Sequence, residues 1–166
     1  MILAAPQPLA PHHDVKNFNS GEPTLDTWLQ RRALKNQASG ASRTYVACSQ
    51  DRVAAYYSLA SGAVVIEAAP GRFRRNMPDP IPVVILGRLA VDQAHQRAGI
   101  GRALVRDAGL RVLNAAAEIG IRGLLVHALS PAAQSFYERI GFAPSPLDPM
   151  TLLITLADLQ AAATQL

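Results

Sequence analysis

The chain has 166 residues, of which 49% are hydrophobic and 17% are charged. This length fits one domain, since domains most often span ~100 to 150 residues, and the apolar content can bury a sizeable core, which excludes a disordered protein. The net charge of +4 comes from 16 basic and 12 acidic side chains. Because 14 of the basic ones are arginine, they favour bidentate recognition of phosphate or carboxylate. We expect a single domain over residues 1–166.

The first predicted element is an amphipathic helix over residues 23–37, in which apolar side chains recur at helical spacing and Gly40 follows as a stop. Residues 43–49 and 53–63 are rich in strand-forming Tyr and Val, and a short polar turn joins them. These two segments predict a β-hairpin.

The middle of the chain predicts a loop followed by a strand, a turn and a helix. Residues 67–82 contain four prolines and three arginines, which indicates a loop. An apolar, β-branched run over residues 83–91 predicts a strand, and a long helical pattern covers residues 100–117. A second apolar strand is expected over residues 121–129.

The last third predicts a helix, a strand and a helical tail. Ser130 is a good N-cap and Pro131 fits the first helical position, so a helix is expected to begin there and to end at Gly141. Residues 151–156 form the last strand candidate, and residues 157–166 form an alanine-rich helix. The order of elements predicts an α/β fold class with an α+β mixed sheet flanked by helices.

The sharpest local motif covers residues 96–103. Gly99 and Gly101 lie where the apolar strand passes into the helix, so the backbone can turn tightly and aim several unpaired N–H groups at one point. Arg97 and Arg102 flank the turn and could add charge-assisted hydrogen bonds to phosphate oxygens. The motif therefore predicts an anion site, for which a pyrophosphate is the natural occupant.

Two other glycine-rich motifs do not fit this segment. A P-loop requires Lys and Ser or Thr after the last glycine, but Arg102 and Ala103 follow Gly101. A dinucleotide-binding fingerprint requires a third glycine where Leu104 stands, and an acidic residue further on that is also missing. Both are excluded, and a structural turn without a ligand remains the alternative.

Three segments together resemble the motifs of GNAT-type acyl-CoA N-acyltransferases. They are residues 86–91, the Gln96-x-x-Gly99-x-Gly101 turn, and the Ser-Phe-Tyr-Glu-Arg-Ile-Gly-Phe stretch over residues 135–142. The resemblance covers roughly residues 18–159. It implies a GNAT-like domain whose central strands splay apart to admit CoA.

The resemblance also implies the site residues. In that family the turn binds the CoA pyrophosphate, the preceding strand pairs with the pantetheine arm, and the later helix supplies a tyrosine, here Tyr137. The phenol of Tyr137 could protonate the departing thiolate, and its alternative is a buried aromatic ring hydrogen-bonded to backbone. The implied cofactor-binding residues are Leu89, Ala90, Val91, Gln96, Arg97, Ala98, Gly99, Ile100, Gly101, Arg102, Ala103, Ser130, Ala133 and Phe136.

Four further segments are similar to the TacT-like toxins of bacterial toxin–antitoxin pairs. They are residues 21–23, 31–37, 40–44 and 145–150, all outside the cofactor motif. This similarity implies that the protein uses acetyl-CoA to acetylate the α-amine of aminoacyl-tRNA, and that this acetylation blocks translation. It also implies a ribbon-helix-helix antitoxin as a partner, and it leaves a homodimer open.

The residue chemistry agrees with an α-amine substrate. Many relatives carry a glutamate as general base on the strand before the turn, but residues 88–91 contain no carboxylate. An α-amine has a reference pKa of ~7.7 to 8.0, against ~10.4 for lysine, so far more of it is neutral at pH 7. An α-amine can therefore attack without a strong base, and water, His127 or a strand carbonyl could relay its proton.

Basic side chains cluster along the chain. Residues 27–111 carry 13 basic and 5 acidic side chains, and the other residues carry 3 and 7. Such a region would attract tRNA phosphates and repel polycations such as aminoglycosides. Each basic residue could also be an ordinary solvated side chain. The candidate tRNA contacts are Arg31, Arg32, Lys35, Arg72, Arg74, Arg75 and Arg88.

Other functions and sites have weaker support. The four histidines show no metal-ligand spacing, so no metal is predicted. Because Cys48 is the only cysteine, an intramolecular disulfide is excluded, and Cys48 is interpreted as a small core residue. Trp28 is interpreted as an anchor on the apolar face of its helix rather than a base-stacking platform. With no signal peptide or membrane span predicted, a cytoplasmic protein without membrane association is expected. A small-molecule amine N-acetyltransferase and a non-catalytic CoA-sensing regulator remain as alternatives.

Overall fold

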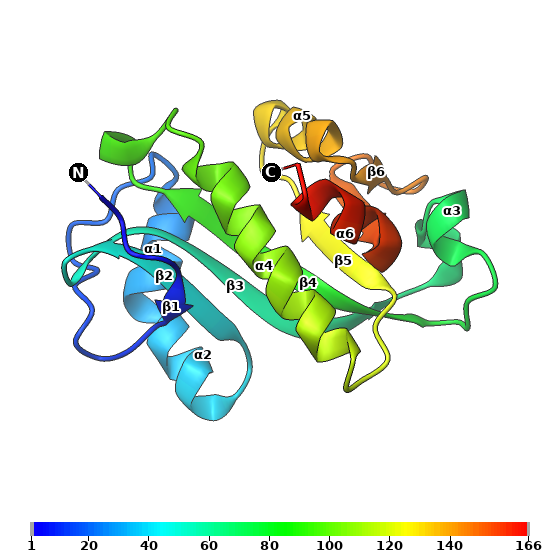
Figure 1. Cartoon of the computed structure of the whole chain (residues 1–166), viewed down its shortest axis with the longest axis horizontal. Coiled ribbons are helices and arrows are strands. Elements are labelled where there is room, and N and C mark those ends of the chain that lie inside the picture. Colours follow the sequence, from blue (N-terminus) through cyan, green and yellow to red (C-terminus); the bar gives the residue numbers. More distant parts are fainter. Residues whose placement is uncertain (1, 166) are drawn as a thin grey trace. The chain divides into compact units, whose positions relative to one another are not determined.

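The computed structural model describes residues 2–165, and over these residues it contains seven strands and six α-helices (Figure 1). The mixed α/β class predicted from the sequence is confirmed. The chain divides into two compact units, of which the first runs to Ala60 and includes Gly87–Asp107, and the second comprises Ser61–Leu86 and the chain from Ala108 onward. The expectation of one domain over residues 1–166 therefore stays a prediction.

The sheet of the first unit begins with three antiparallel strands, β1 (Gln7–Pro8), β2 (Arg43–Ser49) and β3 (Arg52–Val64). The predicted hairpin of β2 and β3 is confirmed, with Tyr45 opposite Tyr57 across the pair. In the strand order, β3 is followed by β4 (Ile81–Val91). The short edge strand β1 has no signal in the sequence because two residues are too few to show a period.

The helix expected over residues 23–37 is two helices, α1 (Pro23–Arg31) and α2 (Ala33–Ser39). At the junction the backbone of Arg32 departs from ideal helix geometry, with φ −119° and ψ −32°. The break turns α2 so that Ala33 is fully buried and Leu34 is 41% exposed, whereas a continuous helix would have placed Leu34 in the core. Gly40 ends α2 at φ 82°, as predicted.

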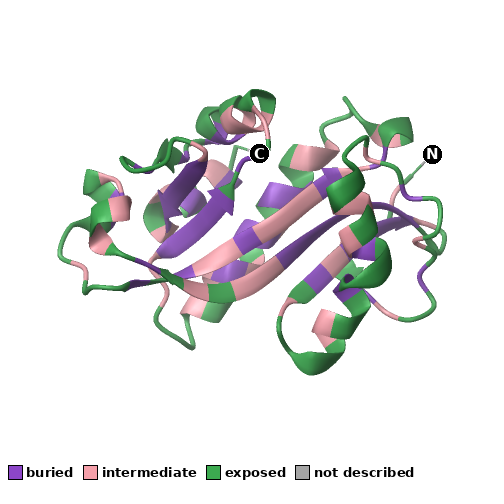
Figure 2. Cartoon of the chain, turned by 180° about the vertical axis from the view of Figure 1, so that it is seen from behind, coloured by how far each residue is buried: buried purple, intermediate pink, exposed green. Residues whose placement is uncertain are grey.

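Neighbouring tyrosines of β3 hold helices on opposite faces of this unit's sheet. The Tyr56 hydroxyl donates to the Leu25 carbonyl of α1 at 2.6 Å, and the Tyr57 hydroxyl donates to Asp107 of α4 (Ile100–Ala116). Successive side chains of a strand point to opposite faces. Accordingly, α1 and α2 cover one face of β2 and β3, and the first turns of α4 cover the other (Figures 1 and 2).

In the second unit the sheet continues with a parallel pair. Residues 84–86 of β4 pair with residues 124–126 of β5 (Gly123–His127), and β5 pairs antiparallel with β7 (Thr151–Thr155). The short β6 (Ala143–Pro144) pairs with β7 at the edge. β5 and β7 are buried over nearly their whole length (Figure 2). The predicted parting of the central strands involves both units and stays a prediction.

The expectation of a plain loop over residues 67–82 is wrong in part. A 3-10 turn (Ile66–Ala68) and the short helix α3 (Gly71–Arg74) interrupt it, and Phe73 of α3 is only 2% exposed. Phe73 packs in a core cluster with Ile81 and Leu125. One buried aromatic residue thus fixes a segment whose prolines suggested irregular backbone.

The last two helices follow the prediction. The Ser130 hydroxyl accepts a hydrogen bond from the Ala133 N–H at 3.1 Å and starts α5 (Pro131–Ile140), which Gly141 ends at φ 129°. The tail forms α6 (Leu156–Ala163), and both α5 and α6 contact β7. The last residue of the predicted tail helix, Leu166, lies outside the described residues.

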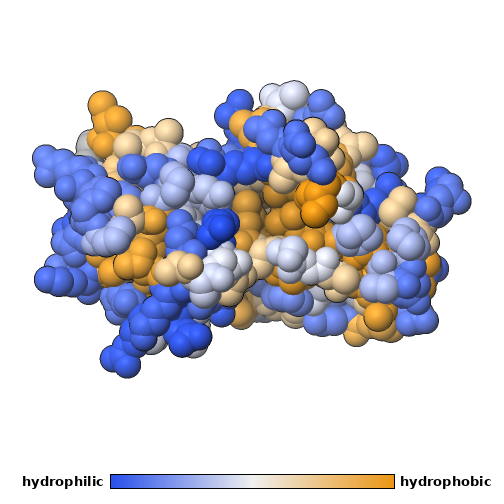
Figure 3. All heavy atoms as spheres, turned by 90° about the horizontal axis from the view of Figure 1, so that it is seen from below, coloured by the Kyte–Doolittle hydropathy of each residue, from blue (hydrophilic) through white to orange (hydrophobic). Residues whose placement is uncertain are grey.

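Large hydrophobic side chains that are exposed to solvent are scattered along the chain, and they include Val65, Ile119 and Leu147. Figure 3 shows one face of the molecule, on which hydrophilic residues interrupt the hydrophobic ones. No helix within residues 2–165 has both the length and the apolar character needed to span a membrane.

Candidate active site

The turn between β4 and α4 has the geometry of an anion site. Arg97 and Gly99 both adopt left-handed backbone, with φ 66° and 79°, so the chain reverses within a few residues. The first hydrogen bond of α4 runs from the Ala103 N–H to the Gly99 carbonyl at 3.2 Å. The N–H groups of residues 99–102 have no acceptor in the described part of the chain. These four donors lie at the positive end of the helix dipole.

Gln96 supports this turn through its side chain. Its amide nitrogen donates to the Ser20 carbonyl at 2.8 Å and to the Val91 carbonyl at 2.9 Å. Both bonds bind the start of the turn to neighbouring backbone. The side-chain amide nitrogen of Gln96, predicted as a cofactor-binding residue, is therefore used to hold the turn, and the Gln96 backbone N–H donates to the Gln93 carbonyl at 3.4 Å.

Asp92 is a second support that the sequence did not reveal. It is 7% exposed, and its two carboxylate oxygens accept hydrogen bonds from the Asn19 N–H at 2.9 Å and the Ala94 N–H at 3.0 Å. The Gln93 N–H in turn donates to the Asn19 carbonyl. The one feature of the sequence that could have indicated this role of Asp92 is the position of its carboxylate directly after the apolar run of residues 83–91. This network fixes the segment that leads into the glycine turn.

The other predicted cofactor residues of this unit differ in exposure. Arg97 and Arg102 are exposed beside the turn, as are Ala98 and Ala103. On β4, Ala90 is 5% exposed and packs in the core cluster of the first unit, so its side chain is committed to packing. A strand residue of this kind can offer a ligand its backbone N–H and carbonyl groups.

In the second unit, Tyr137 is presented by α5 within an aromatic cluster. Its ring lies edge-on to Phe136 and to Phe142, with centroid distances of 5.1 and 5.3 Å. The side chain is 7% exposed, and burial raises the pKa of the phenol, which therefore stays protonated at neutral pH. Its hydroxyl has no hydrogen-bond partner among residues 2–165, in contrast to a structural tyrosine bonded to backbone.

Three side chains at the end of β5 form a connected polar chain. The Nδ1 atom of His127 lies 3.0 Å from the Thr151 hydroxyl oxygen, and that hydroxyl donates to Asp148 Oδ2 at 2.9 Å. Asp148 also accepts from the Met150 N–H at 3.0 Å. The Met150 N–H and the Thr151 hydroxyl lower the pKa of Asp148, which keeps this carboxylate ionised.

The basic residues predicted to contact tRNA fall into two sets. In the first unit, Arg31, Arg32 and Lys35 are exposed on and between α1 and α2. Arg88 of β4 is half-buried, and its guanidinium lies 4.3 Å from the centroid of the Trp28 ring, a cation–π contact. Trp28 also stacks on Tyr56, at 6.0 Å and an interplanar angle of 10°.

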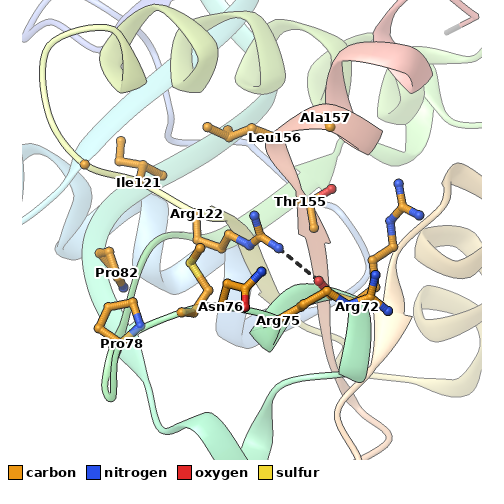
Figure 4. A pocket seen from close by; sticks show the side chains of 12 residues that line it. Arg72, Arg75, Asn76, Pro78, Pro82, Ile121, Arg122, Thr155, Leu156 and Ala157 are labelled. Carbon is orange, nitrogen blue, oxygen red and sulfur yellow. Dashed lines mark hydrogen bonds between the residues drawn. The ribbon is translucent and has the colours of Figure 1, made fainter.

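The second set lies on and next to α3. Arg72, Arg74 and Arg75 are all exposed, and Arg72 forms an ion pair with Asp158 at 2.8 Å. Arg72 and Arg75 line a cavity of about 750 Å³ in the second unit (Figure 4).

Arg122 lines the same cavity and holds the end of α3 in place. Its guanidinium donates to the Phe73 carbonyl at 2.8 Å. It also donates to the Arg72 carbonyl at 2.9 Å, the bond drawn in Figure 4. Apolar side chains, including Ile121 and Leu156, complete the cavity lining. Within the described residues, no group of three or more His, Cys, Asp or Glu side chains could hold a metal ion.

Comparison with known proteins identifies related sequences and structures. A curated protein of Mycobacterium tuberculosis (strain ATCC 25618 / H37Rv), the tRNA-acetylating toxin, is 49% identical over 158 residues, which cover 95% of each chain. The structure of AtaT complexed with acetyl-methionyl-tRNAfMet matches with a TM-score of 0.89 and 28% identity, over 96% of this chain and 98% of that one.

A second structural match is a mutant AtaT toxin bound to the C-terminus of the antitoxin AtaR and acetyl-CoA. It has a TM-score of 0.84 and 28% identity, and the match covers 99% of this chain and 100% of that one. The model of the acetyltransferase (GNAT) domain matches residues 40–144, a segment that includes β4, the glycine turn and Tyr137. The chain therefore belongs to the GNAT family of acetyltransferases.

Proposed function

We propose that this acetyltransferase moves the acetyl group of acetyl-CoA to the α-amine of aminoacyl-tRNA and so removes the charged tRNA from translation. The observation that carries the cofactor assignment is the turn between β4 and α4, where four backbone N–H groups are unpaired. The substrate assignment is supported by 49% identity to a tRNA-acetylating toxin and by the match to AtaT complexed with an acetylated methionyl-tRNA. Action on tRNA would place the protein in the cytoplasm.

Acetyl-CoA would bind along elements whose residues are already described. The N–H groups of residues 99–102 would hold the pyrophosphate, and Arg97 and Arg102 would add charged hydrogen bonds. Residues 89–91 would pair with the pantetheine arm through backbone groups. Ser130, Ala133 and Phe136 would line the path of that arm. The Ser130 oxygen accepts from the Ala133 N–H, and its hydroxyl hydrogen has no acceptor within residues 2–165, so it could donate to a ligand.

The chain's own contribution to the transfer is centred on Tyr137. The neutral amine attacks the thioester carbonyl carbon, and backbone N–H groups of β4 would stabilise the negative oxygen. When the carbon–sulfur bond breaks, the thiolate needs a proton, which the phenol of Tyr137 can donate. The raised pKa of Tyr137 and its unpaired hydroxyl both suit a proton donor.

The glycine turn can be tested with a matched pair of substitutions. Gly99 and Gly40 have φ of 79° and 82°, and at neither would a Cβ atom meet another atom within 4 Å. Alanine at either position should cost about 1 to 2 kcal/mol of stability, because left-handed backbone is unfavourable for it. We expect only Gly99→Ala to weaken acetyl-CoA binding, by roughly tenfold. Calorimetric titration measures this, and equal affinities in the two variants would contradict the assigned turn.

Phosphates of tRNA would contact exposed basic side chains of α1 and α2. Arg31 lies in the last turn of α1, whereas Lys16 is exposed well before that helix. We expect Arg31→Glu to raise the KM for aminoacyl-tRNA several-fold and to reduce the salt dependence of binding by about one phosphate contact. Lys16→Glu makes the same charge change and should leave both quantities near their wild-type values.

The assay that decides the substrate measures transfer of labelled acetyl groups to charged tRNA, free amino acids and polyamines in parallel. Transfer to charged tRNA that salt strongly inhibits supports the proposal. Equal or faster transfer to a small amine would replace it with a small-molecule N-acetyltransferase, and no transfer to any amine would leave a CoA-sensing regulator.

An antitoxin is the expected protein partner, since the matched AtaT structure contains the C-terminus of its antitoxin AtaR. We propose that the antitoxin of this chain is of the ribbon-helix-helix type. We further propose that the toxin acts as a homodimer. Sedimentation of the purified protein alone checks the homodimer. The sequence of the neighbouring gene, and binding of its product on co-expression, check the ribbon-helix-helix antitoxin.

A further inference from the structure

The polar chain at the end of β5 ends in a histidine whose tautomer is fixed. We propose that Nε2 of His127 accepts the proton that the substrate amine loses during acetyl transfer. This inference rests on the proposed transfer to an amine, and it names the proton acceptor that the sequence left open among water, His127 and a strand carbonyl.

The direction of the hydrogen bonds fixes the tautomer. Asp148 is ionised and can only accept, so the single hydroxyl hydrogen of Thr151 is directed to Asp148 Oδ2 at 2.9 Å. The Thr151 oxygen must then accept from His127, whose Nδ1 lies 3.0 Å away. Nδ1 therefore carries the hydrogen of the neutral ring, and Nε2 has a free lone pair. Many catalytic and metal-binding histidines are oriented by a second group in this way.

The position of His127 suits a ligand site. It is the last residue of β5, a strand that runs parallel to β4, and ligands of open sheets bind beyond the carboxyl ends of parallel strands. Its neighbours Val126 and Ala128 are 0% and 8% exposed, whereas the His127 side chain is exposed. Three residues later Ser130 starts α5, the helix that presents Tyr137. One strand and its following helix therefore supply both groups.

The chemistry requires an acceptor even for an α-amine. Such an amine is partly neutral at pH 7, so it can attack unaided, but its nitrogen becomes positively charged once it bonds to the carbonyl carbon. The strand before the glycine turn has no carboxylate over residues 88–91 to take that proton. Neutral imidazole is a competent acceptor near neutral pH.

The proposed steps balance. The amine nitrogen bonds to the carbonyl carbon, and its proton passes to Nε2 of His127. The carbon–sulfur bond then breaks, and the thiolate takes the phenolic proton of Tyr137. The imidazolium finally returns its proton to the phenolate through solvent. In total, one proton moves from the amine to the sulfur of CoA, and no oxidant or metal is needed.

Chemical rescue of His127→Ala tests the proposal. We expect kcat to fall about 10- to 100-fold, less than a full general-base effect because water still accepts the proton, with both KM values near wild type. Added imidazole should restore kcat in proportion to its concentration. A variant with wild-type kcat, or one that imidazole fails to rescue, would overturn the assignment.

Two further variants separate proton transfer from positioning. His127→Asn places an amide nitrogen near the position of Nδ1, so it can still donate to Thr151, but it has no basic nitrogen. It should be as slow as the alanine variant before rescue; full activity would show that only the hydrogen bond matters. Thr151→Val frees the ring and should lower kcat by a smaller factor. All rates are taken with whichever amine the wild-type protein acetylates. A failure of the tRNA assignment is therefore visible in the wild type alone.

Discussion

Replacing Tyr137 with phenylalanine should lower kcat for acetyl transfer by about 10²- to 10⁴-fold and leave the Kd for acetyl-CoA near its wild-type value. The substitution removes only the hydroxyl, which has no hydrogen-bond partner within residues 2–165, so the aromatic cluster with Phe136 and Phe142 is kept. Single-turnover rates and calorimetric titration with acetyl-CoA measure the two quantities.

The matched control is Tyr56→Phe. This tyrosine is also buried, but its hydroxyl is bonded to the Leu25 carbonyl at 2.6 Å, so its loss should cost about 1 kcal/mol of stability and leave turnover little changed. If Tyr137→Phe turns over like the wild type, the phenol is not the proton donor. If the two variants lose activity equally, the loss comes from packing rather than from chemistry.

Gly123→Ala should destabilise the second unit by about 3 kcal/mol or more, because the added methyl group has no space. A Cβ atom there would lie 2.0 Å from the Ile154 carbonyl oxygen and 2.8 Å from Phe73 Cε2. The first of these is backbone of the paired strand β7, which cannot move without loss of the ladder. Urea denaturation followed by circular dichroism measures the change.

Gly120→Ala is the control for that experiment. Gly120 lies three residues before Gly123, in the loop that leads into β5, and a Cβ atom there would meet nothing within 4 Å. Alanine at this site should leave stability unchanged or raise it by up to about 1 kcal/mol, because it restricts the unfolded chain. Equal stability of the two variants would mean that β5 and β7 can separate at Gly123 at little cost.

Elements with strong local signals were predictable. The start of α5 depends on Ser130 and Pro131, and both act within one turn of the helix. The break at Arg32 was not predictable, because residues 23–37 keep helical spacing throughout. The break accompanies the burial of Ala33, which the sequence pattern does not show. The helix α3 forms although the surrounding residues 67–82 are rich in proline, because burial of the single aromatic residue Phe73 stabilises it. That burial depends on strands distant in the sequence.

For the site, the glycine turn was visible because its function depends on residue types next to each other in the chain. The supports of the turn were not, since Gln96 and Asp92 act on Ser20 and Asn19, more than 70 residues away. The hydrogen bond that orients the His127 ring was not visible either, because its partner Thr151 lies on the paired strand β7. Trp28 was expected to anchor the apolar face of its helix, and it packs partly buried against the core cluster of the first unit. Its contact with Arg88 could be found only from the fold.

The hydrogen bond from Gln96 to Ser20 also joins the glycine turn to the segment before α1. Ser20 lies just before α1, and its hydroxyl and N–H bind Asp26 within that helix. Ordering the turn with acetyl-CoA thus also orders the start of the helix that bears Arg31. Binding of either substrate should then favour binding of the other by the same factor. Under the proposed function, the protein with acetyl-CoA bound would be the form that captures tRNA best, and loss of CoA after transfer would loosen its hold on the acetylated product.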